Sequence, residues 1–389
     1  MGQRRIAARL REEAISLVCG VLAKVFEILS QNLNSSFLDL PAGARVAIIK
    51  PCCLGDVVLT TPLIQVVSQA RPDLELDFVV SNWAKPIVAQ NPRLSQIIDT
   101  GFSGSSFNTR QYLTLVGRLR KRKYQAAIVL DRSPWLALLP WLAGIRLRAG
   151  LDSAGRGFAL NVRARLLAKA AVRPEAEIYL EVARSIGLDT NGASLEFYSG
   201  EAARQRFEQK AAQVGLDLAQ PIAVIHPGGG QNPDTTVLSK RWPAQNFGEI
   251  AHRLLQSGWQ VVVIGAQGER AAVKVVAGAI QNSPGFFNLA EQLDISESGA
   301  LFKRASLFVG NDTGLMHLAA ACGTTTIAIF GPSSPIAYGP YTKKGKAVSP
   351  LKRVALEGLP LTEYQALSVA EGGIASVTIE QVWEAIKSK

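Results

Sequence analysis

The chain is poor in the residues from which metal sites, disulfide frameworks and nucleic-acid surfaces are built. Its 389 residues include four cysteines and three histidines, and the cysteines have no metal-binding spacing. Aromatic residues make up 7% of the chain and are sparse among its clustered positive charges, whereas nucleic-acid surfaces commonly interleave the two. We therefore expect no bound metal and no nucleic-acid partner.

A membrane-spanning run and a secretory signal are also missing from the sequence. The apolar run near the amino terminus is interrupted by Lys24 and Glu27, and its uncharged part is shorter than the roughly 20 residues that cross a bilayer. No signal with a cleavage site is visible, and the cysteines form no disulfide framework. These absences favour a protein of the reducing cytoplasm.

Apolar residues, by contrast, are abundant. They make up 48% of the chain, against 19% charged residues, which is typical of a well-buried globular protein. The chain is longer than one hydrophobic core ordinarily supports, so we expect two domains. A polar stretch at about 191–220 marks their junction. The expected parts are a helix at 1–40, α/β domains at 41–200 and 201–375, and a final helix at 376–389, which in folds of this kind commonly crosses back to the first domain.

Buried strands alternate with helices in both halves, which predicts parallel sheets with right-handed crossovers. In the first half we expect strands at Arg45–Lys50, Leu76–Val80 and Ala126–Leu130, with helices at Val57–Ala70, Trp83–Gln90 and Tyr112–Arg122. In the second half we expect strands at Ile222–Ile225, Gln260–Ile264, Leu307–Val309 and Thr324–Phe330, with helices at Ala244–Ser257, Ser296–Arg304, Leu315–Cys322 and Thr378–Lys387.

One loop in the second half has the features of an anion site. Asp312 or Thr313 can cap a helix that opens at Gly314, and the first N–H groups of a helix attract phosphate. Gly314 lets the backbone approach a diphosphate closely, and His317 lies one turn inside. The alternative is an ordinary capped helix with a buried histidine.

A second loop, in the first half, ends with Gly55 and Asp56. It follows the carboxyl end of a predicted parallel strand, where ligands bind in open α/β sheets. Asp56 therefore faces a cleft, although it can equally serve as a helix cap.

Three other positions in the second half are candidates for contact with a phosphorylated ligand. Gly228 and Gly229 follow a strand and permit close backbone approach, although a mobile turn fits them as well. Lys240, beside Arg241 and Trp242, places positive charge near the cleft. Glu269 follows the next strand and can be either a ligand contact or a first-turn acid stabilised by the helix dipole.

Positive charge is concentrated in one part of the first half. Residues 101–175 contain fourteen Lys or Arg and three Asp or Glu, an excess equal to the +11 of the whole chain. Such an excess indicates an anionic acceptor or membrane surface, or simply a solvated basic helix. The densest cluster consists of Arg118, Arg120, Lys121, Arg122 and Lys123.

The amino-terminal segment has one apolar helical stripe, from Leu10 to Leu29, preceded by four arginines. A helix of this kind either lies on an anionic membrane surface or packs against the first domain. The sequence leaves both alternatives open.

Two motifs carry a family resemblance. The string Asn311–Ala321, followed by a strand and Phe330–Pro335, resembles the donor-site signature of the ADP-heptose:lipopolysaccharide heptosyltransferases, glycosyltransferase family 9. Leu54–Pro62 resembles the amino-terminal motif of the same family. The resemblance implies the GT-B fold, in which two Rossmann-like domains with parallel sheets face a central cleft.

The resemblance also implies roles for the candidate residues. Asp56 is expected to act as general base, Lys240 to contact the donor phosphates, and Glu269 to bind the ribose. The loop Asp312–Gly314 and His317 are expected to hold the donor. No cofactor is then required, and no Asp-x-Asp metal motif occurs in the sequence.

The implied activity is inverting transfer of a heptose or related sugar from a nucleotide diphosphate to an anionic glycolipid or other glycan, at the inner face of the cytoplasmic membrane. A nucleotide-sugar epimerase and a non-catalytic sugar-binding homologue are the alternatives. A dinucleotide oxidoreductase fits less well, because no Gly-x-Gly-x-x-Gly follows the first strand.

Overall fold

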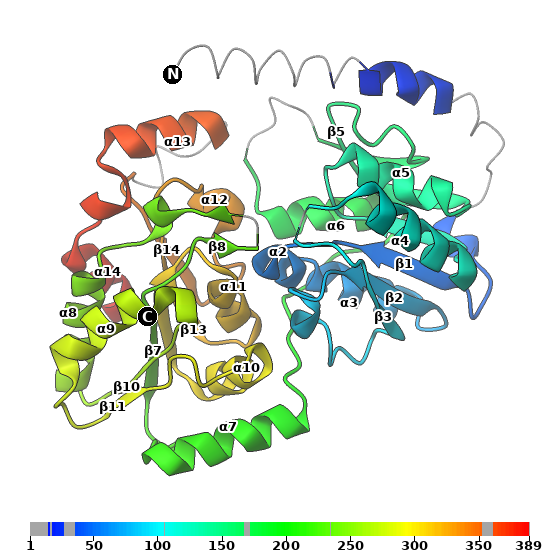
Figure 1. Cartoon of the computed structure of the whole chain (residues 1–389). Helices are drawn as coiled ribbons and strands as arrows, with labels where there is room; N and C mark the ends of the chain where they lie inside the picture. The colour runs from blue at the N-terminus through cyan, green and yellow to red at the C-terminus, as the bar shows by residue number, and fades with distance from the viewer. Residues whose placement is uncertain are drawn as a thin grey trace.

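The computed structural model describes residues 15, 18–26, 36–104, 106–166, 172–233, 235–351 and 361–388. These residues form two α/β domains that lie side by side (Figure 1), each built on a parallel sheet of six strands. The predicted fold class, two Rossmann-like domains in the GT-B arrangement, is confirmed.

The first domain has the strand order β3-β2-β1-β4-β5-β6. Its strands are β1 (Arg45–Ile49), β2 (Glu75–Val80), β3 (Gln96–Asp99), β4 (Ala126–Val129), β5 (Leu147–Ser153) and β6 (Val162–Leu166). Its helices are α2 (Leu54–Leu59), α3 (Thr61–Ala70), α4 (Thr109–Arg122), α5 (Pro134–Leu142) and α6 (Glu175–Ser185), with short 3-10 turns at η1 (Phe37–Asp39) and η2 (Lys85–Ile87). The central strands are buried along nearly their whole length, as expected for a sheet covered on both faces.

The second domain repeats this plan with the order β11-β10-β7-β12-β13-β14. Its strands are β7 (Ile222–His226), β10 (Gln260–Val263), β11 (Phe286–Asn288), β12 (Leu307–Asn311), β13 (Thr325–Ile329) and β14 (Gly345–Val348), and a small hairpin pairs β8 (Gln231–Asn232) with β9 (Thr235–Thr236). Its helices are α7 (Glu201–Val214), α8 (Ala244–Gln256), α9 (Arg270–Ile280), α10 (Ile295–Arg304), α11 (Gly314–Ala321), α12 (Pro335–Tyr338), α13 (Leu361–Ala370) and α14 (Ile379–Lys387), with 3-10 turns at η3 (Leu238–Lys240), η4 (Gln267–Glu269) and η6 (Gly373–Ser376).

Two of the predicted helices differ from the observed ones. The expected helix Val57–Ala70 is divided at Thr60 into α2 and α3, because Pro62 has no N–H to continue the ladder and the hydroxyls of Thr60 and Thr61 donate to the carbonyls of Val57 and Val58. The expected helix Trp83–Gln90 is only the 3-10 turn η2, which contains Pro86.

The last helix was expected to return to the first domain, and this was wrong. Val382 and Ile386 on α14 are buried in the core of the second domain with Ile327 and Ile329 of β13. Glu380 also pairs with Arg253 of α8. The apolar face of α14 is therefore buried in the second domain, to which the preceding strands belong. It is not available to pack against the first domain.

Residues 18–26 form the described part of the amino-terminal helix, and the rest of the predicted stripe lies outside the described residues. Cys19 and Phe26 are buried against Phe158 and Ala159 of the first domain, and the Phe26 ring contacts the ring of Phe158. The helix therefore packs against the first domain. Its other face is apolar and exposed, at Val18, Val21 and Val25. Within the described residues, no helix is long and apolar enough to cross a membrane.

A buried carboxylate in the first sheet depends on the predicted basic cluster. Asp77 of β2 is fully buried, and its Oδ2 accepts hydrogen bonds from the Arg122 guanidinium at 2.6 Å and the Tyr124 hydroxyl at 2.7 Å. Arg122 thus stabilises the sheet, because a buried charge without a partner is costly.

We expect Arg122→Met to lower the free energy of unfolding by about 3 kcal/mol, since the buried carboxylate would keep only a neutral donor. Arg118→Met is the matched control on the same helix. Arg118 is exposed and donates to the Asp99 carbonyl, so its loss should cost no more than about 0.5 kcal/mol. Urea unfolding followed by circular dichroism measures both, and equal losses would contradict the role given to Arg122.

Candidate active site

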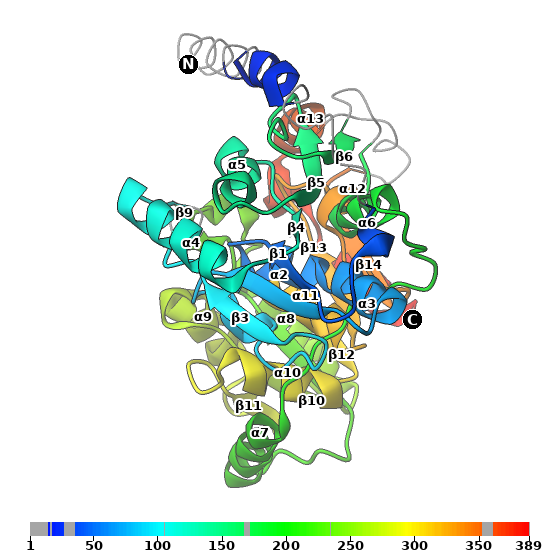
Figure 2. The same cartoon turned by 90° about the vertical axis from the view of Figure 1, so that its right-hand side faces the viewer.

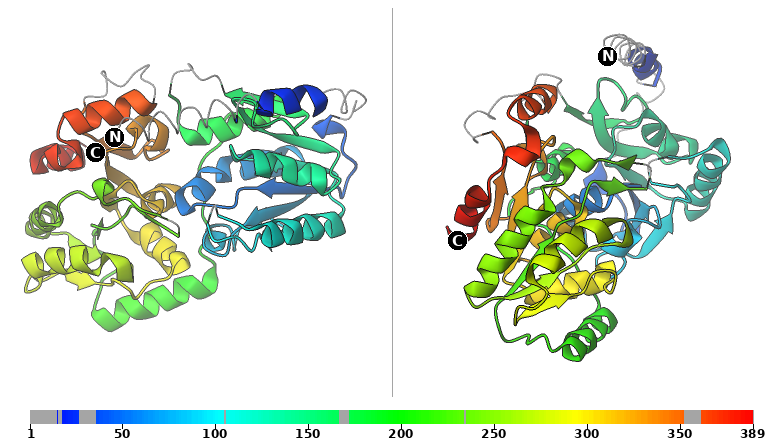
Figure 3. Two further views of the ribbon diagram at one scale, coloured as in Figure 1. Left: turned by 45° about the horizontal axis from the view of Figure 1, so that its top comes forward. Right: turned by 60° about the vertical axis from the view of Figure 1, so that its left-hand side comes forward.

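The two domains meet where helix α2 of the first domain contacts helix α11 of the second (Figures 1 and 3). The contact is made by glycines. A Cβ on Gly314 would lie 2.7 Å from the Leu54 Cβ, and a Cβ on Gly55 would lie 2.8 Å from Cδ2 of His317. Such distances are too short for real side chains, so the two helix starts approach at backbone distance only because both positions are glycine.

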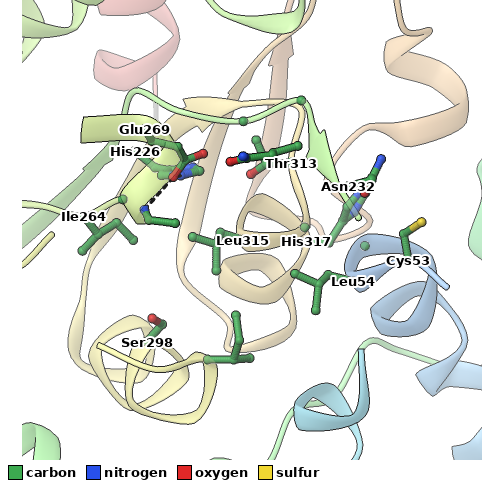
Figure 4. Close-up of a pocket in the computed structure, with 18 of the residues that line it drawn as sticks. Cys53, Leu54, His226, Asn232, Ile264, Glu269, Ser298, Thr313, Leu315 and His317 are labelled. Carbon is green, nitrogen blue, oxygen red and sulfur yellow. Dashed lines mark hydrogen bonds and ion pairs between the residues drawn. The ribbon is translucent and has the colours of Figure 1, made fainter. Parts of the chain in front are cut away.

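A cavity of about 580 Å³ lies beside this contact. Figure 4 shows Cys53 and Leu54 of the first domain approaching it from the side opposite Glu269 and Ile264 of the second. The volume is in the range of sites that enclose a small-molecule ligand. The first domain contributes Cys53, Leu54, Gly55 and Trp83, and the second domain contributes most of the remaining lining, including His226, Gly229, Lys240, Glu269, Asp312, Thr313, Gly314 and His317.

The predicted anion loop begins helix α11 as expected. Thr313 is the N-cap, and its hydroxyl accepts a hydrogen bond from the Met316 N–H. Lys240 reaches this loop, with its Nζ 2.6 Å from Oδ2 of Asp312. The structure therefore gathers a cation, a carboxylate and the positive end of a helix dipole at one wall of the cavity, an arrangement suited to a diphosphate.

Lys240 is preceded by a loop, residues 231–239, that contains the β8–β9 hairpin. The N–H of Val237 donates to the Gly230 carbonyl at 2.7 Å. The loop thus returns to the point where it left. Trp242, just beyond Lys240, is fully buried and anchors the segment through its ring N–H to the Val377 carbonyl.

The buried amide of Asn311 fixes the loops around the anion site. Its Oδ1 accepts a hydrogen bond from the Trp242 N–H, and its Nδ2 donates to the carbonyls of Pro227 and Gly228. One side chain at the end of β12 therefore ties together the glycine loop and the lysine loop.

The glycine loop is tightly packed. A Cβ on Gly228 would lie 2.1 Å from the Glu269 carboxyl group, and a Cβ on Gly229 would lie 2.3 Å from the Thr313 methyl group. Gly229 also has a φ of +123°, which strongly favours glycine.

Glu269 is buried beneath this loop. Its Oε2 lies 3.0 Å from His226 Nε2 and accepts a hydrogen bond from the Ala266 N–H. Burial would raise the pKa of Glu269, but His226 and the backbone N–H groups of Ala266 and Gly229 lower it to about 2. Glu269 lines the cavity, but these bonds already occupy part of its carboxylate.

His317 is a buried, neutral ring at the junction of the domains. Burial lowers the pKa of His317, even though Asp312 and Asp56 oppose the shift. Its Nδ1 is buried, and among the described residues it has no hydrogen-bond partner. His317 also lines the cavity, so its ring can contact a bound ligand.

Asp56 lies in the first turn of α2, next to Gly55. Its side chain is partly exposed, and its Oδ2 lies 3.3 Å from the Nζ of the buried Lys50. Lys50 also contacts Asp131 at 3.2 Å. Asp56 is not one of the residues that line the cavity, but its neighbour Gly55 is. A carboxylate held in this way can accept a proton from a hydroxyl group that reaches it.

Comparison with known proteins agrees with this geometry. A family model described as glycosyltransferase family 9 (heptosyltransferase) matches residues 112–357, which is more than half of the chain. The chain belongs to glycosyltransferase family 9. It is therefore a glycosyltransferase, as the two motifs predicted.

Two curated relatives and a solved structure show the extent of the similarity. Lipopolysaccharide heptosyltransferase 2 of Escherichia coli K12 is 26% identical over 310 residues, covering 78% of this chain and 87% of the relative. Lipopolysaccharide heptosyltransferase 1 of Pseudomonas aeruginosa is 27% identical over 318 residues, covering 76% and 81%. The structure of E. coli ADP-heptose lipopolysaccharide heptosyltransferase II superposes with a TM-score of 0.69 at 24% identity, covering 88% of this chain and 98% of that one.

The predicted basic cluster lies away from the cavity of this family 9 transferase. Arg122 contacts Arg45 at the start of β1, whereas Asp56 lies beyond the end of that strand. Arg118 and Arg120 donate to the carbonyls of Asp99 and Leu142, and Lys121 and Lys123 are exposed. None of these five described residues lines the cavity.

Sequence reasoning missed Lys50, Asp131 and Asn311. The signal for Lys50 was a single lysine directly after a buried strand, at the edge where ligands bind. Asp131 follows β4, the parallel neighbour of β1. Lys50 and Asp131 therefore lie at the same edge of the sheet, and a prediction of this strand pairing would have placed them side by side. Cys52 and Cys53, which are neighbours in the chain, form a disulfide that the sequence analysis did not predict.

We expect the family 9 transferase to lose stability in acid partly through Glu269. Its lowered pKa contributes stability that is fully present above about pH 4.5 and is lost as the pH falls toward about 2. The difference in melting temperature between wild type and Glu269→Gln should therefore be largest at neutral pH and shrink across this window. Scanning calorimetry between pH 7 and pH 2 tests this, and a difference that does not change with pH would contradict it.

Proposed function

We propose that this chain transfers a heptose from ADP-heptose to the core of lipopolysaccharide or a related anionic glycan. The observation that carries the proposal is the composite cavity, in which Gly55, the neighbour of Asp56, lies on the first-domain side and Lys240, Asp312 and the start of α11 lie on the other. Two of the relatives are lipopolysaccharide heptosyltransferases 1 and 2, which supports the sugar and the acceptor class.

In the proposed mechanism, Asp56 takes a proton from an acceptor hydroxyl as the oxygen of that group attacks the anomeric carbon of the donor. The bond between that carbon and the diphosphate oxygen breaks, and the configuration is inverted. Lys240 and the N–H groups of Thr313 and Gly314 stabilise the charge that develops on the departing diphosphate. Asp312 and His317 orient the donor, and Glu269 with the glycine loop binds its nucleoside end.

Positive charge at the diphosphate comes from the protein in this scheme, so we propose that no metal or other cofactor is required. An epimerase is not favoured, because the matching family model and the curated relatives are heptosyltransferases. A non-catalytic homologue would keep the cavity but show no dependence on Asp56.

We further propose that the protein binds the inner face of the cytoplasmic membrane, where a glycolipid acceptor lies. Figures 1 and 2 show the amino-terminal helix and α13 at the same end of the molecule, one on each domain. Both present apolar side chains to solvent, at Val18, Val21 and Val25 on the first helix and at Leu367 and Val369 on α13.

The inward face of α13 explains why these residues point outward. The hydroxyls of Tyr364 and Ser368 both donate to the Gly331 carbonyl, so the helix is anchored by that side. Exposed cations, Lys24 and Arg165, lie on the amino-terminal helix and on β6 of the first domain. Apolar side chains next to cations favour adsorption to an anionic bilayer.

Because the proposed base and the phosphate-binding lysine lie on different domains, we expect their variants to impair different steps, catalysis in one case and ADP binding in the other. Asp56→Asn should lower kcat by roughly 100-fold to 10,000-fold, because the base is lost, and should leave ADP affinity unchanged. Lys240→Met should weaken ADP binding by about tenfold or more, because a charge-assisted contact to phosphate is lost.

Calorimetry with ADP, UDP, GDP and NAD, together with transfer from ADP-heptose to heptose-deficient lipopolysaccharide in the presence of EDTA, measures both effects. Full activity of Asp56→Asn would exclude base catalysis by this residue. Tighter binding of UDP or GDP than of ADP would replace the proposed donor, and tighter binding of NAD would overturn the mechanism.

Membrane binding should depend on the exposed valines. Replacing Val18, Val21 and Val25 by serine should weaken binding to vesicles of phosphatidylethanolamine and phosphatidylglycerol by about tenfold, because less apolar surface is buried in the bilayer. The matched control is Val214→Ser with Val275→Ser, two exposed valines on α7 and α9. Vesicle flotation that is equal for the two variants would exclude this face as the membrane contact.

A further inference from the structure

Lys50 is a buried cation that the proposed mechanism does not yet use. It follows β1 directly, and its side chain is 7% exposed. Its Nζ lies between two carboxylates, 3.3 Å from Asp56 Oδ2 and 3.2 Å from Asp131 Oδ2, and 5.7 Å from the centre of the Tyr179 ring. A buried lysine is rare unless its charge is paired, so this placement calls for an explanation.

The two carboxylates differ in how they are held. Asp131 uses both oxygens, since its Oδ1 accepts a hydrogen bond from the Ser133 N–H and its Oδ2 accepts one from Lys50. Asp56 uses only Oδ2, and in the part of the chain that the structure describes its Oδ1 accepts no hydrogen bond. Asp131 is therefore the fixed partner of Lys50, and Asp56 keeps an oxygen for chemistry.

Without Lys50, two carboxylates would face each other near the protein interior. Two carboxylates that both contact one lysine lie close together, and their negative charges repel each other. This repulsion raises the pH at which the second of the two groups ionises. Burial alone would lower the pKa of Lys50, but Asp56 and Asp131 raise it, so the lysine remains charged.

We propose that Lys50 is a positioning residue that keeps the carboxylate of Asp56 ionised and oriented beside Asp131. The inference rests on the proposed role of Asp56 as the base. When Asp56 takes the proton from the acceptor hydroxyl, its charge disappears, but Lys50 remains paired with Asp131. The site thus completes the proton transfer without leaving a buried charge unpaired, which would otherwise oppose the step.

Other charged and titratable groups lie around Lys50 and Asp56 on the helices α6, α11 and α12. Tyr179 and Glu175 lie on α6, with Glu175 bound by both guanidinium nitrogens of Arg132. His317 on α11 and Tyr338 on α12 complete the surroundings. Burial raises the pKa of Tyr179 and of Tyr338 to well above their ordinary value, and burial keeps His317 neutral. Lys50 and Asp131 are therefore the charges that dominate at Asp56 near neutral pH.

The test is a carbon-13 NMR titration of the Asp56 carboxyl group in the full-length protein, with the signal assigned by its loss in Asp56→Asn. In Lys50→Met the titration midpoint should rise by about one pH unit or more, because the compensating charge is gone. In the double variant Lys50→Met with Asp131→Asn it should return close to that of wild type. Lys50→Arg, which keeps the charge, should stay near the wild-type midpoint.

The titration requires no transfer reaction, so it separates this inference from the proposed function. An unchanged midpoint in folded Lys50→Met would overturn the role of Lys50, even if the protein transfers heptose. In the transfer assay, Lys50→Met should also lose kcat by roughly tenfold or more at neutral pH, because the Asp56 carboxylate is no longer held in position. The KM for ADP-heptose should stay unchanged, and the acid limb of the rate should move to higher pH. A defect confined to KM would contradict the proposal.

Discussion

The contact of α2 with α11 through Gly55 and Gly314 is the constraint on which the rest of the site depends. The two sheets each direct their strand ends toward the interface, but only the glycines let the two helix starts come together. This proximity brings Asp56 of one domain to the border of a cavity built mainly by the other. A bulkier residue at either position would separate the acid–base group from the anion-binding loop without disturbing either domain's core.

Charge is distributed across this interface in two linked sets. On the first domain, Lys50 joins Asp56 and Asp131, and on the second domain, Lys240 joins Asp312. On the first domain two carboxylates share one lysine, and on the second domain one carboxylate has one lysine, so each side of the interface carries a cation beside its carboxylates. The buried amide of Asn311 carries no charge and fixes three backbone groups at once.

Local sequence could predict the parts of the site that lie on one loop. Thr313 and Gly314 follow a strand and begin a helix, so their geometry depends on consecutive residues and can be predicted from them. Lys50 and Asp131 are 81 residues apart, and only the pairing of β1 with β4 brings them together, which no local pattern reveals. Local sequence likewise does not set the position of the cluster from Arg118 to Lys123, because neighbouring residues of a helix point in different directions and α4 ends near the start of β1.

The β8–β9 hairpin leaves the glycine loop at Gly230 and rejoins it through Val237. Because the two ends of this segment are held together, its length can change between them while Lys240 stays paired with Asp312. The hairpin lines the cavity at Gln231 and Asn232. A change in its length or composition would therefore alter the shape of the cavity without displacing the residues proposed to hold the phosphates.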